Sequence, residues 1–100
     1  MAANSSVKFS QHRDQVKLCG ELNFESVADL LNDSQLSFEH GDVEVDLSGI
    51  SRFNSASLAL LIEWVKMAQQ KGMQVSYHRA SEQLAVIAQA YGIDRELPLK

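Results

Sequence analysis

The sequence contains one cysteine and one proline among 100 residues. A single thiol, Cys19, cannot form an intramolecular disulfide and is too few for a zinc cluster built on cysteine. The proline, Pro98, lies near the C-terminus, so no proline-rich linker divides the chain, and we expect a single domain over residues 1–100 with an ordered core of about residues 7–99. The chain has neither a signal-peptide-like apolar region nor a run of ~20 apolar residues, which predicts a cytoplasmic protein.

Clusters of positive charge are also missing. The formal net charge is −4, and the nine lysines and arginines are scattered along the chain. This distribution disfavours both nucleic-acid binding and direct insertion into or adsorption onto an anionic membrane. The chain also lacks the Gly-x-x-x-x-Gly-Lys pattern that cradles phosphates, so the sequence does not predict nucleotide binding.

The residues that most often perform catalysis or bind metals form no recognisable pattern. His12, His40 and His78 are far apart in the sequence, and we expect them to be solvated surface residues. Glu44 and Asp46 alternate along a predicted strand and are expected on a solvated sheet face without a basic companion. The sequence therefore predicts no catalytic residue, no metal site and no cofactor.

Apolar and polar residues alternate in four segments, which predicts four strands. Residues 7–9 and 16–19, with a polar turn at 11–14 between them, form a candidate antiparallel hairpin with one wet face. Residues 43–47 form a third strand, which the following Ser-Gly pair is expected to end, and residues 73–77 form a fourth.

Three segments with helical spacing lie between and after these strands. The first is expected to begin with Ser26 and Asp29 in a capping-box-like pair and to end between residues 32 and 36. The last is expected to begin at Ser81 and end at Gly92, with an apolar stripe comprising Leu84, Ile87, Ala88 and Tyr91. The resulting order is β-β-α-β-α-β-α, which predicts a single α/β domain with a small mixed sheet packed by helices.

The middle helix, ending before Gly72, has three candidate N-cap residues: Asn54, Ser55 and Ser57. It is apolar on two sides. The predicted core stripe comprises Leu58, Leu61, Ile62, Val65 and Ala68, whereas Leu60, Trp64 and Met67 point roughly the opposite way. A neighbouring helix could cover Leu60 and Trp64, but tryptophan and methionine are enriched at protein interfaces, which favours a docking surface and a binding module over an enzyme.

Two segments of the sequence resemble a known family. They are Gly20-Glu21-Leu22 and the segment from Asp46 to Leu61, which reads Asp-Leu-Ser-Gly-Ile-Ser-Arg-Phe-Asn-Ser-Ala-Ser-Leu-Ala-Leu-Leu. Both resemble the STAS domain family of sulfate-transporter cytoplasmic domains and anti-sigma-factor antagonists. Within that family the chain is most similar to the MlaB-like branch, small subunits of ABC complexes that move phospholipids between Gram-negative membranes. The resemblance extends over nearly the whole chain and implies a STAS-like fold.

The resemblance places Ser55 at the family's signature serine or threonine. In anti-sigma antagonists a partner kinase phosphorylates this hydroxyl, whereas in the lipid-transport branch the same turn and the following helix dock on the ATP-binding subunit. Here Asn54 and Ala56 stand where the family commonly has aspartate and glycine, which weakens the case for phosphorylation more than the case for docking. A purely structural role for Ser55, as a helix cap, is the third interpretation.

The resemblance thus implies two functions. The first is a non-catalytic cytoplasmic subunit of an ABC phospholipid transporter that maintains outer-membrane lipid asymmetry. It would bind the ATP-binding subunit and regulate or stabilise it. Through that subunit it would contact the membrane permease and lie peripheral to the inner membrane. The alternative is a partner-switching antagonist controlled by phosphorylation of Ser55, in which the added charge would release the partner. The predicted docking residues are Asn54, Ser55, Ala56, Ser57, Leu60, Trp64 and Met67.

Overall fold

The computed structural model describes residues 7–33 and 36–100. Its elements are β1 (Val7–His12), β2 (Gln15–Gly20), α1 (Phe24–Asp33), β3 (Val43–Ile50), α2 (Ser55–Gln70), β4 (Val75–His78) and α3 (Glu82–Ala90). The predicted order β-β-α-β-α-β-α and the α/β fold class are confirmed. Over the described ranges, none of the helices combines the length and apolar character needed to span a bilayer.

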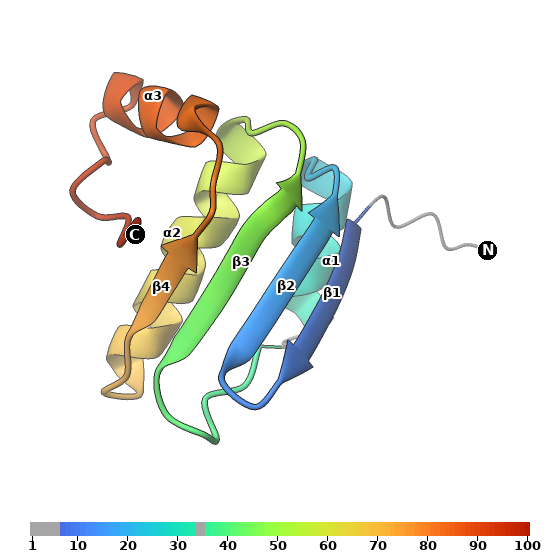
Figure 1. The fold of residues 1–100 in the computed structure, drawn as a ribbon, viewed down its shortest axis with the longest axis vertical. Coiled ribbons are helices and arrows are strands. Elements are labelled where there is room, and N and C mark those ends of the chain that lie inside the picture. The colour runs from blue at the N-terminus through green and yellow to red at the C-terminus, as the bar shows by residue number, and fades with distance from the viewer. Residues whose placement is uncertain (1–6, 34–35) are drawn as a thin grey trace.

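The four strands form one mixed sheet in the order β1-β2-β3-β4. β1 and β2 are the predicted antiparallel hairpin, whereas β2 pairs with β3, and β3 with β4, in parallel. Helices α1 and α2 lie behind the sheet, and α3 lies on the β4 side of the end toward which β2, β3 and β4 point (Figure 1). The other face of the sheet has no helix over it in this view, which agrees with the predicted wet face.

Three strands are longer than the sequence predicts. The hairpin strands reach His12 and Gln15, leaving a two-residue turn in which Arg13 adopts a φ of 59°. β3 does not end at the Ser-Gly pair but continues to Ile50. Gly49 pairs with Cys19 of β2, and a β-carbon at Gly49 would lie 2.6 Å from the Cys19 sulfur. The glycine therefore allows two strands to approach closely and does not end the strand.

Helix α2 is covered on both of its apolar sides. Leu60 and Trp64, which were predicted to face a partner, are 0% and 2% exposed. The Trp64 ring packs edge-on against Phe9 of β1, with ring centroids 6.0 Å apart, and α1 packs beside α2. The prediction of a docking face at Leu60 and Trp64 is wrong because the sheet and the neighbouring helix α1, which lies beside α2 behind the sheet, leave neither side chain exposed. Met67 is partly buried against the same core.

A buried tyrosine joins α2 to β4. The Tyr77 hydroxyl donates a 2.6 Å hydrogen bond to the Leu61 carbonyl oxygen. Burial raises the pKa of Tyr77 well above its usual value, so the hydroxyl remains a donor throughout the physiological pH range. The outer edge of β4 is also occupied, because Tyr77 forms a bridge with Leu99 in the C-terminal segment. These contacts complete the sheet on its β4 side.

Helix α3 agrees only in part with its predicted pattern. Ser81 occupies the N-cap position, but its side chain makes no capping hydrogen bond. Leu84 and Ala88 are buried and Ile87 is partly buried, as the periodicity predicts. Tyr91 lies beyond the last helical residue and is 61% exposed. The apolar stripe therefore ends one turn earlier than predicted.

Candidate docking site at two paired helix starts

The start of α2 is built by a capping box. The backbone N–H of Ser57 donates to Asn54 Oδ1 at 3.0 Å, and the backbone N–H of Asn54 donates to Ser57 Oγ at 2.7 Å. These bonds satisfy two of the N–H groups that a helix start leaves without partners. Phe53 and Leu58, the two positions of a hydrophobic staple, are both buried. Asn54 is therefore the N-cap, and Ser57 completes the box.

The start of α1 repeats this arrangement. The N–H of Ser26 donates to Asn23 Oδ1 at 2.8 Å, and the N–H of Asn23 donates to Ser26 Oγ at 2.9 Å. The staple positions Leu22 and Val27 are again buried. The predicted start at Ser26 with Asp29 is wrong, because Ser26 is the third residue of the helix and Asn23 is its cap. The two starts read Leu-Asn-Phe-Glu-Ser-Val and Phe-Asn-Ser-Ala-Ser-Leu.

Two hydrogen bonds join these helix starts to each other and to α3. Asn54 Nδ2 donates to the Leu22 carbonyl oxygen at 2.9 Å, which ties the cap of α2 to the loop before α1. The Phe53 N–H donates to Gln83 Oε1 of α3 at 3.0 Å. The starts of α1 and α2 consequently lie at the same end of the molecule, with α3 on its β4 side (Figure 1).

Ser55 is exposed at the first helical position of α2. Within the described residues, its hydroxyl has no hydrogen-bond partner, since Asn54 and Ser57 supply the cap. The structure therefore contradicts the interpretation of Ser55 as a helix cap. The other predicted docking residues are less accessible: Asn54 and Met67 are half-buried, and the buried ones are Ala56, Ser57, Leu60 and Trp64.

Two accessible apolar residues near these helix starts were not predicted from the sequence. Phe24 is 76% exposed and Val86 is 64% exposed. Phe24 occupies the same first helical position in α1 that Ser55 occupies in α2. The Asn-x-x-Ser pattern, present at both starts, is the signal that could have found this correspondence.

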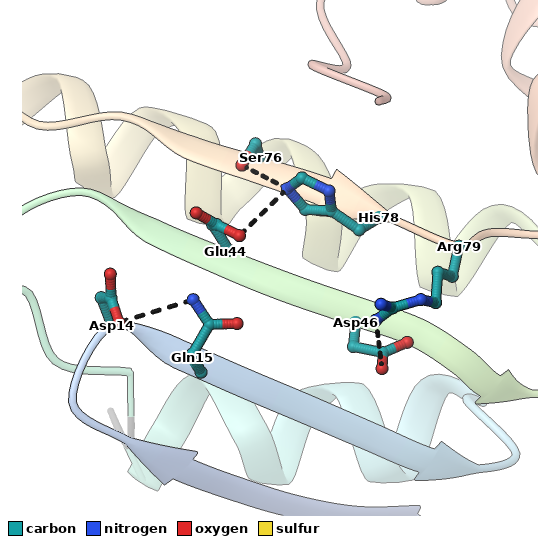
Figure 2. A network of polar contacts seen from close by, with 7 residues as sticks. All are labelled: Asp14, Gln15, Glu44, Asp46, Ser76, His78 and Arg79. Atoms are coloured by element: carbon teal, nitrogen blue, oxygen red, sulfur yellow. Dashed lines mark hydrogen bonds and ion pairs between the residues drawn. The ribbon is translucent and has the colours of Figure 1, made fainter.

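A polar network occupies the open face of the sheet (Figure 2). Arg79 Nη1 lies 3.2 Å from Asp46 Oδ2, and His78 Nε2 lies 3.7 Å from Glu44 Oε1. The prediction that these acids lack a basic companion is wrong, because Arg79 and His78 come from the end of β4, which pairs with β3. Hydrogen bonds from Ser48, with a smaller contribution from Arg79, lower the pKa of Asp46 below its usual value.

This network has the composition of a catalytic triad but not its geometry. Ser76 Oγ lies 2.9 Å from His78 Nε2, the same ring nitrogen that faces Glu44. In a triad, the carboxylate instead binds the ring nitrogen opposite to the one that contacts the nucleophile. The prediction that His78 is solvated is wrong, because its ring is half-buried and contacts Ser76 and Glu44. His12 and His40 are exposed. Over residues 7–33 and 36–100 no group of three or more histidine, cysteine or acidic side chains could hold a metal ion.

Comparison with known proteins provides a family and several structural neighbours. The family model described as the Mlab STAS domain matches residues 5–99. The structure of the anti-sigma factor antagonist SpoIIAA in its unphosphorylated form superposes with a TM-score of 0.70 at 12% identity, covering 94% of this chain and 87% of that chain. RsbS from Moorella thermoacetica, as a serine-to-glutamate variant, gives 0.67 at 18% identity, covering 96% and 86%.

A third structure, of the Bacillus cell fate determinant SpoIIAA in the phosphorylated form, gives a TM-score of 0.65 at 14% identity, with 94% of this chain and 90% of that chain covered. At these identities the structural neighbours establish the fold alone. No curated protein sequence gives a significant match.

Proposed function

This chain belongs to the MlaB-like STAS domain family, and we propose that it is a non-catalytic subunit that binds the ATP-binding subunit of an ABC phospholipid transporter. In this role it lies on the cytoplasmic side of the inner membrane and contacts the permease through the ATP-binding subunit. Its docking regulates or stabilises the ATPase of a complex that maintains outer-membrane lipid asymmetry. Nothing in the described residues points to an enzyme activity of the chain itself.

The exposed hydroxyl of Ser55 is the observation that carries this proposal. Ser57 and Asn54 hold the helix start, so Ser55 is not needed for capping. A residue that is exposed on a rigid, hydrogen-bonded framework can meet a partner with little loss of conformational entropy. The half-buried Asn54 and the buried Ser57 hold the helix start in place, while Ser55 contacts the partner directly.

Ser55 substitutions test this docking surface. Ser55→Tyr is expected to weaken binding to the ATP-binding subunit about 10-fold or more, because a bulky ring at this position keeps the two surfaces apart. The measurement is the Kd of each purified variant for the ATP-binding subunit. Ser55→Ala is the control; it should leave the thermal unfolding midpoint unchanged, since the wild-type hydroxyl makes no hydrogen bond. Equal affinity of Ser55→Tyr and the native chain, with both folded, would remove Ser55 from the interface.

A partner-switching antagonist is the second candidate, favoured by the structural neighbours that are anti-sigma-factor antagonists. The accessible hydroxyl of Ser55 lies at the positive end of α2, where a phosphate is electrostatically favoured. The partner would then be a kinase. Phosphoserine at position 55 in protein isolated from growing cells would support this candidate, and its absence under all growth conditions would count against it.

A further inference from the structure

We propose that Phe24 is an anchor of the docking surface, inserting into an apolar recess of the ATP-binding subunit that is rimmed by lysine or arginine side chains. The proposal rests on the proposed function and adds to it a residue outside the α2 segment. It also specifies the chemistry of the partner surface. Phe24 takes the place in the interface that the sequence analysis assigned to Trp64, which the fold buries.

The paired helix starts bring Phe24 to Ser55. Each residue is the first of its helix and directly follows the capping asparagine. The two caps are connected, because Asn54 Nδ2 donates to the carbonyl oxygen of Leu22, two residues before Phe24. A partner that covers Ser55 at this end of the molecule therefore also meets the Phe24 ring.

The exposed Phe24 side chain is not needed for packing of the fold. Its side chain is 76% exposed, while the staple positions of α1 are filled by the buried Leu22 and Val27. Phenylalanine is also a weaker helix former than alanine, so local helix formation does not call for it. An exposed phenylalanine on a rigid cap is an aromatic side chain of the type that dominates protein interfaces.

A second exposed apolar residue lies on α3, the helix that is hydrogen-bonded to the turn before α2. Val86 of α3 is 64% exposed. It lies one helical turn beyond Gln83, whose side chain accepts the hydrogen bond from Phe53 N–H. Helices α1 and α3 thus lie on opposite sides of the start of α2, and each carries an exposed apolar side chain, Phe24 on α1 and Val86 on α3.

The charges around these helix starts specify the partner. The exposed acids Glu25 and Glu82 lie in the first turns of α1 and α3, whereas the turn before α2 carries one exposed cation, Arg52. A surface with this excess of carboxylates is complementary to a basic one, and rim charges of this kind accelerate association and fix orientation. The occupant is therefore an apolar recess with a basic rim and not an acidic or purely apolar surface.

The test measures binding of purified variants to the ATP-binding subunit at several salt concentrations. Phe24→Ser is expected to raise the Kd about 10-fold or more. Glu25→Lys is expected to slow association and to reduce the dependence of the association rate on salt concentration. Tyr91→Ser is the matched control. Tyr91 is 61% exposed but follows the far end of α3, so its replacement should leave the Kd unchanged. Circular dichroism checks that every variant is folded.

The outcomes separate this inference from the function on which it rests. If Ser55→Tyr weakens binding and Phe24→Ser does not, the docking function holds and Phe24 is not an anchor. Phe24→Ser and Tyr91→Ser weakening the Kd equally would also overturn the inference, because any exposed aromatic would then matter. If the native chain does not bind the ATP-binding subunit at all, the proposed function itself fails.

Discussion

Replacing Trp64 by alanine is expected to lower the free energy of unfolding by about 3–5 kcal/mol, the range found for large aromatic-to-alanine changes in protein cores. Trp64 is 2% exposed and packs edge-on against Phe9, so its removal leaves a cavity between α2 and β1. Urea unfolding followed by circular dichroism measures the change; tryptophan fluorescence cannot be used, since Trp64 is the only tryptophan. Because a loss of this size is comparable to the whole stability of a small domain, the variant is expected to be partly unfolded.

Glu63→Ala is the matched control for Trp64→Ala. Glu63 precedes Trp64 in α2 but is exposed, so its replacement should change the unfolding free energy by less than about 0.5 kcal/mol. The opposite pattern, in which Trp64→Ala folds with native stability but loses its partner, would contradict the burial of Trp64. It would return Trp64 to the docking surface that the sequence analysis predicted.

Introducing a side chain at Gly49 is the second large effect. In Gly49→Ala the added methyl group would lie 2.6 Å from Cys19 Sγ and 2.8 Å from the Leu18 carbonyl oxygen, both shorter than van der Waals contact. The β2 and β3 strands must separate locally, and we expect a loss of about 1–3 kcal/mol in unfolding free energy. Ser10→Ala, at an exposed position of β1, is the control and should be close to neutral.

A double variant identifies the source of the Gly49 effect. Cys19→Ala removes the sulfur but leaves the backbone oxygen of Leu18 in place, so Gly49→Ala combined with Cys19→Ala should regain part of the lost stability. A double-mutant cycle on urea unfolding measures this coupling. Strict additivity of the two changes would show that Cys19 Sγ does not limit the space at Gly49.

Short-range patterns in the sequence were sufficient to predict the order of elements. Alternating apolar residues located all four strands, and the 3.6-residue spacing located three helices. The extent of β3 was missed because glycine usually weakens a strand, whereas Gly49 is required for the close approach to Cys19. Such an approach depends on which strand lies alongside, and a single segment of sequence does not encode that information.

The docking surface was predicted only in part, for a similar reason. Helical spacing showed that α2 has two apolar sides, but it could not show that α1 and β1 cover the side bearing Trp64. The turn containing Ser55 was identified from the family resemblance. Phe24 was missed because the cap of α1 was assigned to Ser26, three residues after the true cap Asn23, so Phe24 was not recognised as the first helical residue.

Affinity purification of the tagged chain from detergent-solubilised cells of its own host, with mass spectrometry of partners present in comparable amounts, tests the central claim most directly. The proposed function predicts that an ABC ATP-binding subunit and its membrane permease are recovered together with the chain. Recovery of a soluble kinase-like protein without membrane subunits would contradict the transport function and establish the partner-switching alternative in its place.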